Sequence, residues 1–462
     1  MPFDTGDTAW LLASSALVLL MTPGLALFYG GMTRSKSVLN MMMMSFGAIA
    51  LVSVLWVAYG YSLSFHGDVN GWGLIGNLDA VGLHGLINTV SENVPVTTPE
   101  LAFVAFQLMF AIITVALISG AIADRAKFGT WMVFAGLWAT LVYFPVAHWV
   151  FYFGPDLAST TDGGFIADHI GAYDFAGGTA VHVNAGAAAL ALAIVLGRRR
   201  GWPRERFKPH NVPMVLIGAG LLWFGWFGFN AGSATAANGL AAQAFINTQV
   251  ATAAGLLGWI FVEWIRDKKP TALGAGSGAV AGLVAITPAC ATITPIGSIA
   301  LGLFAGAVCA LAVGLKYRFR YDDSLDVVGV HLVGGAVGAL LIGFLANAAT
   351  LGTDIDGIFY GGDATQLGKQ AQAVVMVGVY SFVVTLILGY LLEKTIGFRV
   401  KPEAEEEGVD TAEHAESAYD FSPAGGGGGG AFALAGIGTP APPAPDGRAT
   451  EPEPEPSPEK VG

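Results

Sequence analysis

The chain has 462 residues, of which 54% are hydrophobic and only 12% charged. Ordinary soluble domains carry roughly 25% charged residues, so this composition excludes a soluble protein and predicts one whose main solvent is lipid. The formal net charge of -12 is mostly local, because residues 401–462 hold 13 acidic and 3 basic residues. The rest of the chain is close to neutral, and we expect no nucleic-acid partner.

Eleven apolar segments are long enough to cross a bilayer as helices. They cover about 8–30, 38–64, 100–122, 130–152, 175–197, 212–231, 241–265, 272–288, 294–315, 327–347 and 370–393. Asp4 and Asp7 precede the first segment where a cleaved signal would carry basic residues, so we interpret it as a span. The predicted fold class is an all-α polytopic membrane protein with eleven transmembrane helices.

The positions of the basic residues predict how the chain is oriented in the membrane. They follow the first, third, fifth, seventh, ninth and eleventh segments, and Lys369 is the exception among the 22 lysines and arginines. The positive-inside rule therefore places the N-terminus outside and the C-terminus in the cytoplasm. We expect a multi-pass protein of the cell inner (plasma) membrane.

Two histidines lie in otherwise apolar spans, His182 in the fifth and His331 in the tenth. A titratable group in hydrocarbon is costly and is usually kept where it lines a cavity or meets a partner. The two spans enter from opposite sides, and each carries its histidine early. We therefore predict two inverted five-helix halves plus a final helix, with the histidines in related positions.

The composition of the chain changes at two points near its C-terminus, after residues 395 and 421. We assign residues 1–395 to the membrane domain and 396–421 to a cytoplasmic regulatory segment, since its acidic residues alternate with Val409, Tyr419 and Phe421 as anchors. Residues 422–462 are rich in Gly, Pro and Glu and are predicted to be disordered. The alternative for 396–421 is a solvated acidic extension.

Four separated stretches carry a family resemblance: MTPGLALFYGGMTRSKSVLN, DFAGGTAVHVNAGAAAL, WFGFNAGSA and DDSLDVVGVHLVGGAVG. In this order they resemble the Amt/Mep/Rh ammonium transporter family, on the bacterial Amt side. The resemblance implies a transporter of ammonium or methylammonium rather than an enzyme, without cofactor or metal. It also implies a homotrimer with one pore per subunit, the two histidines side by side near mid-membrane, and a trimeric PII-type nitrogen regulatory protein as cytoplasmic partner.

The same resemblance assigns the pore residues. The outer mouth that recruits ammonium comprises Phe110, Phe151 and Ser233, with Phe110 and Phe229 as stacked rings below it. Many relatives have Trp where this chain has Phe151, so Trp149 is an alternative partner for the cation. Asp174, Asp326, Phe106 and Gln107 are assigned to the vestibule and its structure. Unaided, an aspartate at the start of a span, such as Asp174 or Asp326, predicts a helix cap.

The chemistry of these side chains agrees with that assignment. Aromatic faces attract a cation, and a hydroxyl accepts a hydrogen bond from an N–H group. A narrow apolar path beyond them rejects potassium and sodium, because nothing there replaces their water. Two neutral imidazoles in contact share a proton and offer an acceptor to NH₃.

Three rival functions stay open on the sequence. A bis-histidine haem protein would use His182 and His331 as axial ligands. An ammonium sensor would conduct little and relay occupancy through the tail. An Rh-like channel would pass neutral gas, although Asp174 and the mouth containing Ser233 favour the Amt type, which recruits a cation.

Overall fold

The computed structural model describes residues 3–69, 71–87, 89–90, 96–154, 163–205, 207–350 and 355–419. Their regular structure is helical, and these residues contain no β-strand beyond isolated bridges. Residues Met1–Ala418 form one compact unit. The predicted disordered tail, 422–462, and the expected anchor Phe421 lie outside the described residues.

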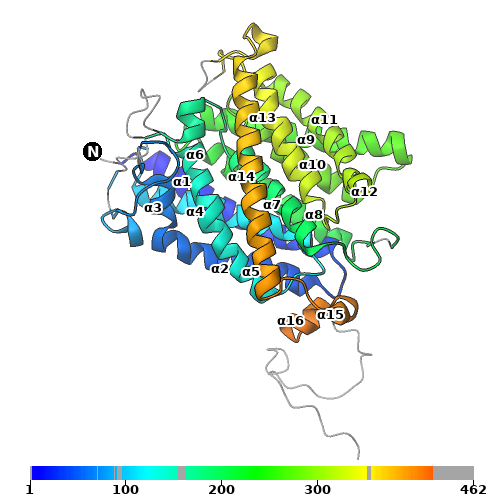
Figure 1. Cartoon of the computed structure of the whole chain (residues 1–462). Helices are drawn as coiled ribbons and strands as arrows, with labels where there is room; N and C mark the ends of the chain where they lie inside the picture. The colour runs from blue at the N-terminus through cyan, green and yellow to red at the C-terminus, as the bar shows by residue number, and fades with distance from the viewer. Residues whose placement is uncertain are drawn as a thin grey trace, which may run out of the picture. The chain divides into compact units, whose positions relative to one another are not determined.

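Ten helical stretches of the described chain are long and apolar enough to cross a membrane. The helices that build them are α1 (Thr5–Met32), α2 (Val38–Leu55), α3 (Tyr61–Phe65), α4 (Glu100–Ile118), α5 (Phe128–Trp138), α6 (Phe144–Phe151), α7 (Asn184–Leu196), α8 (Val212–Gly232), α9 (Gly239–Asp267), α11 (Pro295–Ala312), α12 (Leu315–Phe319), α13 (Val333–Leu345) and α14 (Thr365–Thr395). Short π-helical turns join α2 to α3 and α5 to α6, and others precede α7 and α13. Figure 1 shows α14 running the length of the bundle.

The segment expected as the eighth span forms α10 (Ala272–Ile286), which has 15 residues and is shorter than the other spans. It packs against α9 through glycines, because a Cβ on Gly255 would lie 2.6 Å from the Cα of Gly282. Lipid supplies no hydrophobic drive between helices, so this close backbone approach is what dispersion forces need to hold them together. The sequence prediction of an apolar helix here is confirmed, while its crossing of the membrane is a proposal.

The helices α7 and α13 run in opposite directions. Arg199, just after the end of α7, binds Asp322, just before the turn that leads into α13, with an Nη2–Oδ1 distance of 2.9 Å. The same guanidinium reaches Asp124 in the α4–α5 connection, with 3.0 Å between Nη1 and Oδ2. Burial alone raises the pKa of Asp322, but the hydrogen bonds and charge of Arg199 and the charge of Arg125 lower it overall. An ionised cluster therefore ties three connections together at one end of the bundle.

The segment after α14 returns to that end as two short helices, α15 (Pro402–Glu407) and α16 (Val409–His414) (Figure 1). The carboxylate of Asp410 accepts hydrogen bonds from the backbone N–H groups of Leu39 at 3.0 Å and Asn40 at 2.8 Å. Glu413 accepts one from the N–H of Phe128 at 2.9 Å. The first N–H groups of a helix have no partner within it, so these acids cap α2 and α5.

A second set of contacts fixes α15. Glu405 is buried; its carboxylate accepts a hydrogen bond from the N–H of Arg200 at 2.7 Å and pairs with Arg399 at 2.6 Å. Val409 is fully buried, and Tyr419 is half-buried. Of the three expected anchors, Val409 therefore packs as a core residue. Ion pairs and helix-capping hydrogen bonds hold the rest of α15 and α16 in place.

Candidate functional site

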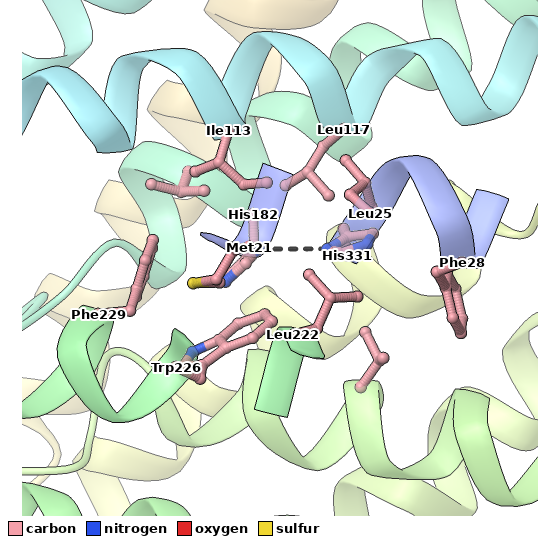
Figure 2. A pocket seen from close by; sticks show the side chains of 12 residues that line it. Met21, Leu25, Phe28, Ile113, Leu117, His182, Leu222, Trp226, Phe229 and His331 are labelled. Atoms are coloured by element: carbon pink, nitrogen blue, oxygen red, sulfur yellow. Dashed lines mark hydrogen bonds between the residues drawn. The ribbon is translucent and has the colours of Figure 1, made fainter. Parts of the chain in front are cut away.

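The site is centred on the two histidines predicted to lie in spans. His182 lies in the π-helical turn Gly178–Val183 that precedes α7, and His331 lies in the turn Val328–Leu332 that precedes α13. The Nδ1 atoms are 3.2 Å apart, and the ring centroids are 5.3 Å apart with an interplanar angle of 28° (Figure 2). The side chains are buried, with 1% and 4% of their residue surface exposed. Residues 149 positions apart in the chain are thus brought into direct contact.

The contact restricts the protonation of the pair. One Nδ1 must donate and the other accept, so two neutral rings in this contact have opposite tautomers. The Nε2 atom of His182 is buried and has no hydrogen-bond partner in the described structure. A buried nitrogen without a partner is costly unless something else satisfies it, which makes this atom available to a small molecule in the cavity beside it.

That cavity is small and apolar. It encloses about 10 Å³, close to the least space that takes one water-sized molecule. Besides the histidines its wall consists of Met21, Leu25, Phe28, Ile113, Leu117, Val181, Leu222, Trp226, Phe229 and Val280. A haem between the imidazoles would have to separate two nitrogens that are in direct contact, so the site does not fit the haem hypothesis.

Trp226 is a wall residue that the sequence analysis did not single out. Its ring stacks on His182 with 5.3 Å between centroids and an angle of 22°, and its Nε1–H donates to the Thr287 hydroxyl at 2.8 Å. The spacing of three residues from Phe229 was the available signal, since it puts both rings on one face of α8. This contact fixes the orientation of the His182 imidazole.

Two stacked rings lie beside His182, between it and a second cavity. Phe110 and Phe229 lie 4.1 Å apart between centroids at an angle of 19°, and the centroids of His182 and Phe229 are 6.2 Å apart. Phe106 is fully buried, with its ring 4.9 Å from that of Phe110. It therefore supports the stacked pair from behind.

An open cavity of about 570 Å³ lies beyond these rings. Phe151, Ser233, Gln107 and Asp174 are among the residues that line it. The Phe151 ring meets the edge of Phe110 at 6.3 Å, and the hydroxyl of Ser233 donates to the carbonyl of Phe229 at 2.8 Å, which leaves its lone pairs as acceptors. The mouth residues expected from the sequence are thus brought together.

Trp149, the alternative cation partner, has its ring engaged elsewhere in the described structure. Its Nε1–H donates to the carbonyl of Leu74 at 2.8 Å, and its ring packs on Tyr380 of α14 with 4.7 Å between centroids. It does not line the cavity that Phe151 lines. Because Trp149 and Phe151 are two residues apart on a helix, their rings point in directions about 200° apart. The ring of Phe151 is the one that faces the cavity.

Asp174 holds the turn that carries His182. One carboxylate oxygen accepts the N–H groups of Gly177 at 2.9 Å and Gly178 at 2.6 Å, and the other accepts those of Thr179 at 2.7 Å and Ala180 at 3.1 Å. Burial raises the pKa of this carboxyl, while the hydrogen bonds oppose the rise. Both carboxylate oxygens therefore accept backbone N–H groups, which is the structural role of a helix cap.

The matching cap at the other end is made by a different residue from the one expected. Asp323, not Asp326, accepts the N–H of Val328 at 2.8 Å, and Asp326 instead pairs with Lys316 at 2.7 Å. Asp326 has a φ of 64°, so its backbone is in the left-handed region and not in the extended conformation that N-cap residues usually have. Burial and the nearby charge of Asp326 raise the pKa of Asp323 to about 6.

A model of the Ammonium Transporter Family matches residues 9–419. The chain belongs to the ammonium transporter family. This is a family of transporters rather than enzymes, and within the described ranges no group of three or more His, Cys, Asp and Glu side chains is arranged to hold a metal.

Individual members of the family are similar over most of their length. The ammonium transporter of Mycobacterium tuberculosis is 59% identical over 440 residues, which cover 92% of this chain and 92% of that protein. The ammonium transporter of Bacillus subtilis is 47% identical over 415 residues, 90% of this chain and 98% of that one. Among solved structures, Candida albicans Mep2 aligns with a TM-score of 0.80 at 34% identity, covering 91% and 94% of the two chains. A sensor Amt protein aligns with a TM-score of 0.80 at 29% identity, covering 88% and 98%.

Proposed function

We propose that this protein recruits ammonium at the cavity lined by Phe151 and Ser233, deprotonates it and conducts NH₃ past the paired histidines into the cytoplasm. The observation that carries the proposal is the Nδ1–Nδ1 contact of 3.2 Å inside a small apolar cavity. Such a passage suits a neutral molecule of the size of water and opposes a hydrated ion.

Recruitment rests on the rings and the hydroxyl at the mouth. Phe110 and Phe151 present a face and an edge to each other, and Ser233 adds acceptor lone pairs. Cation–π attraction contributes about 0.5–2 kcal/mol per ring, and a hydroxyl replaces part of the lost hydration. Potassium has the same charge but donates no N–H hydrogen bond and cannot lose a proton.

Conduction then depends on the proton. Ammonium that gives up a proton above the Phe110–Phe229 pair leaves NH₃, which can accept a hydrogen bond from one imidazole and donate one to the other. The unpartnered Nε2 atom of His182 supports this role. The proton either stays outside or is carried separately, and a transport current distinguishes the two cases.

The topology that accompanies this function has eleven crossings, with α10 as the short one. We place the N-terminus outside and the C-terminus in the cytoplasm of the plasma membrane. The inverted halves are supported by the two π-helical turns, since each is followed by a helix of 13 residues, α7 or α13, and these run in opposite directions.

Assembly and control are further parts of the proposal. We propose a homotrimer with one pore per subunit, and a PII-type regulatory protein that binds the cytoplasmic face where α15 and α16 lie. The caps that Asp410 and Glu413 place on α2 and α5 support residues 396–421 as a regulatory segment of that face. Residues 422–462 are proposed to be a tail that transport does not need.

A sensor that conducts little is the second candidate, favoured by the likeness to a solved sensor Amt protein. Uptake assays with purified protein in liposomes distinguish the transporter from the sensor. Uptake of methylammonium that ammonium inhibits and potassium does not would support the transporter. Saturable binding without uptake would support the sensor, and equal competition by potassium would contradict both. An Rh-like gas channel would pass methylamine with no dependence on the vestibule residues.

A further inference from the structure

The end of α7 borders a groove that the transport mechanism does not use. The groove holds about 510 Å³ and is lined by Leu190, Ala193, Ile194, Arg198, Phe319 and Arg320, among others. Its apolar wall follows α7 for about two turns, and its basic end lies just past the last residues of two spans, Leu196 and Phe319. An apolar trough that ends in arginines at the limit of the spans has the layout of an acyl chain with its headgroup.

The positive charge of this groove is uncompensated. Arg198 and Arg320 are exposed, and no acidic side chain of the described residues forms an ion pair with either. The carboxylate of Asp322, which also borders the groove, is engaged on both oxygens by Arg199. The groove thus presents two positive charges to an anion.

Arg198 is held in place rather than free. Its Nε–H donates to the carbonyl of Arg320 at 3.0 Å, and its guanidinium lies 5.6 Å from the ring of Trp202. Trp202 in turn stacks on Tyr317 at 5.8 Å with an angle of 10°. Aromatic rings beside arginines at the end of a span are typical of the headgroup level of a membrane.

A second apolar groove lies on the other side of Ile194. It also holds about 510 Å³ and is formed by Ile194 and Val195 with Leu386, Ile387, Tyr390 and Leu391 of α14. Ile194 is half exposed and is the ridge between the two troughs. One headgroup with two chains matches this arrangement better than a single-chain ligand does.

From these observations we infer that Arg198 and Arg320 bind the phosphate of an anionic diacyl phospholipid whose chains lie on either side of Ile194. Basic groups at a membrane surface each contribute about 1 kcal/mol, or about fivefold in affinity, for anionic lipid. The ligand is a lipid rather than free phosphate, because the apolar troughs make up most of the lining. The inference is independent of how the pore conducts.

The test measures lipid binding to full-length protein that has been delipidated in detergent. Native mass spectrometry follows titration with dioleoyl phosphatidylglycerol and with dioleoyl phosphatidylcholine, which has the same chains without net charge. The wild type is expected to bind phosphatidylglycerol more tightly. Arg198→Gln with Arg320→Gln should weaken phosphatidylglycerol binding roughly thirtyfold or more and bring it to the level of phosphatidylcholine.

The matched control is Arg204→Gln with Arg318→Gln, which removes two exposed arginines at the same end but outside the groove. It should leave the preference within about threefold of the wild type. Ile194→Trp fills both troughs and should weaken both lipids while leaving the arginines in place. Because Arg198, Arg320 and Ile194 are exposed, gel filtration is expected to show folded protein for every variant.

Three results would overturn the inference. Phosphatidylglycerol binding unchanged in the Arg198 and Arg320 variant would remove the headgroup site. Displacement of the lipid by millimolar inorganic phosphate would make it a phosphate site. Dissociation of the oligomer by Ile194→Trp, with no lipid bound to the intact wild type, would assign the groove to a second copy of the chain.

Discussion

The Nδ1 atoms of His182 and His331 lie 3.2 Å apart, close enough to share one proton. Each ring comes from a π-helical turn at the start of its helix, and each turn is capped by a buried aspartate, Asp174 or Asp323. Since π-helical turns leave the regular hydrogen-bond ladder, the caps take up N–H groups that the turns leave free. The geometry of the pair therefore depends on contacts at both ends of the bundle.

Phe151→Trp is expected to tighten apparent ammonium affinity. A larger ring face replaces a weaker one at the mouth, and the difference between two cation–π partners is a fraction of about 0.5–2 kcal/mol, so the gain is at most severalfold. Half-saturation of methylammonium uptake measures it. Trp149→Phe is the matched control, because its ring packs on Tyr380 and should leave affinity unchanged. An unaltered half-saturation value in Phe151→Trp would show that residue 151 does not face the cation.

Asp174→Ala is expected to destabilise the protein by about 2 kcal/mol, because it leaves four buried N–H groups without an acceptor. Thermal unfolding in detergent should show a lower midpoint. Asp363→Ala is the comparison, since Asp363 caps α14 through one N–H of Thr365 at 2.8 Å and is exposed. An equal drop in the unfolding midpoint of the two variants would mean that the hydrogen bonds of Asp174 do not hold the turn.

The spans and the histidines were predictable because each follows from local composition. Twenty apolar residues in a row and a lone imidazole within them are visible in the sequence itself. Which aspartate of DDSLD caps the turn was not visible, since Asp323 and Asp326 are both near its start and the choice depends on the positive φ at Asp326. The stacking of Trp226 on His182 needed the relative placement of α7 and α8.

The division of the tail at residues 396–421 stays a prediction. Its acidic and apolar alternation indicated an ordered segment, and Val409 within it is buried. Its targets were not predictable. Asp410 binds the start of α2, 370 positions away in the chain, and no pattern near residue 410 indicates which helix it caps.

Truncation after residue 421 is expected to leave transport intact, whereas truncation after residue 396 should reduce it. The shorter protein loses the carboxylates that cap α2 and α5, so their first N–H groups are exposed. Binding of a purified PII-type protein should be retained by the longer chain and lost by the shorter one. Asp410→Ala alone should give an intermediate loss of transport. Identical behaviour of the two truncations would contradict the division at 396–421.

Asp323→Asn is expected to change how stability depends on pH. The folded protein raises the pKa of Asp323 from 3.8 to about 6, so its ionised form is disfavoured in the fold. The cost is present above pH 6 and disappears as the pH falls towards 4. The variant keeps an acceptor oxygen for Val328 without the charge, so it should gain on the wild type by about 1–3 kcal/mol at pH 7.5 and lose most of that gain near pH 4.5.

Thermal unfolding of both proteins across this range measures the difference. Glu416→Gln removes an exposed carboxylate of the tail and should track the wild type at every pH. A difference between Asp323→Asn and the wild type that does not vary with pH would contradict the raised pKa of Asp323.

Transport currents on solid-supported membranes, recorded with purified protein in liposomes, test the paired-histidine pore most directly. The comparison is between wild type and the double variant His182→Ala with His331→Ala, each challenged with ammonium and with potassium. We predict that the wild type transports ammonium and not potassium, as a current where the proton is carried separately and as uptake without current where it stays outside. In the double variant we expect either no transport or transport that no longer distinguishes the two ions. Labelled methylammonium is followed in parallel, because its uptake also reports transport of the neutral amine, which produces no current. Wild-type rates and selectivity in the double variant would contradict the account.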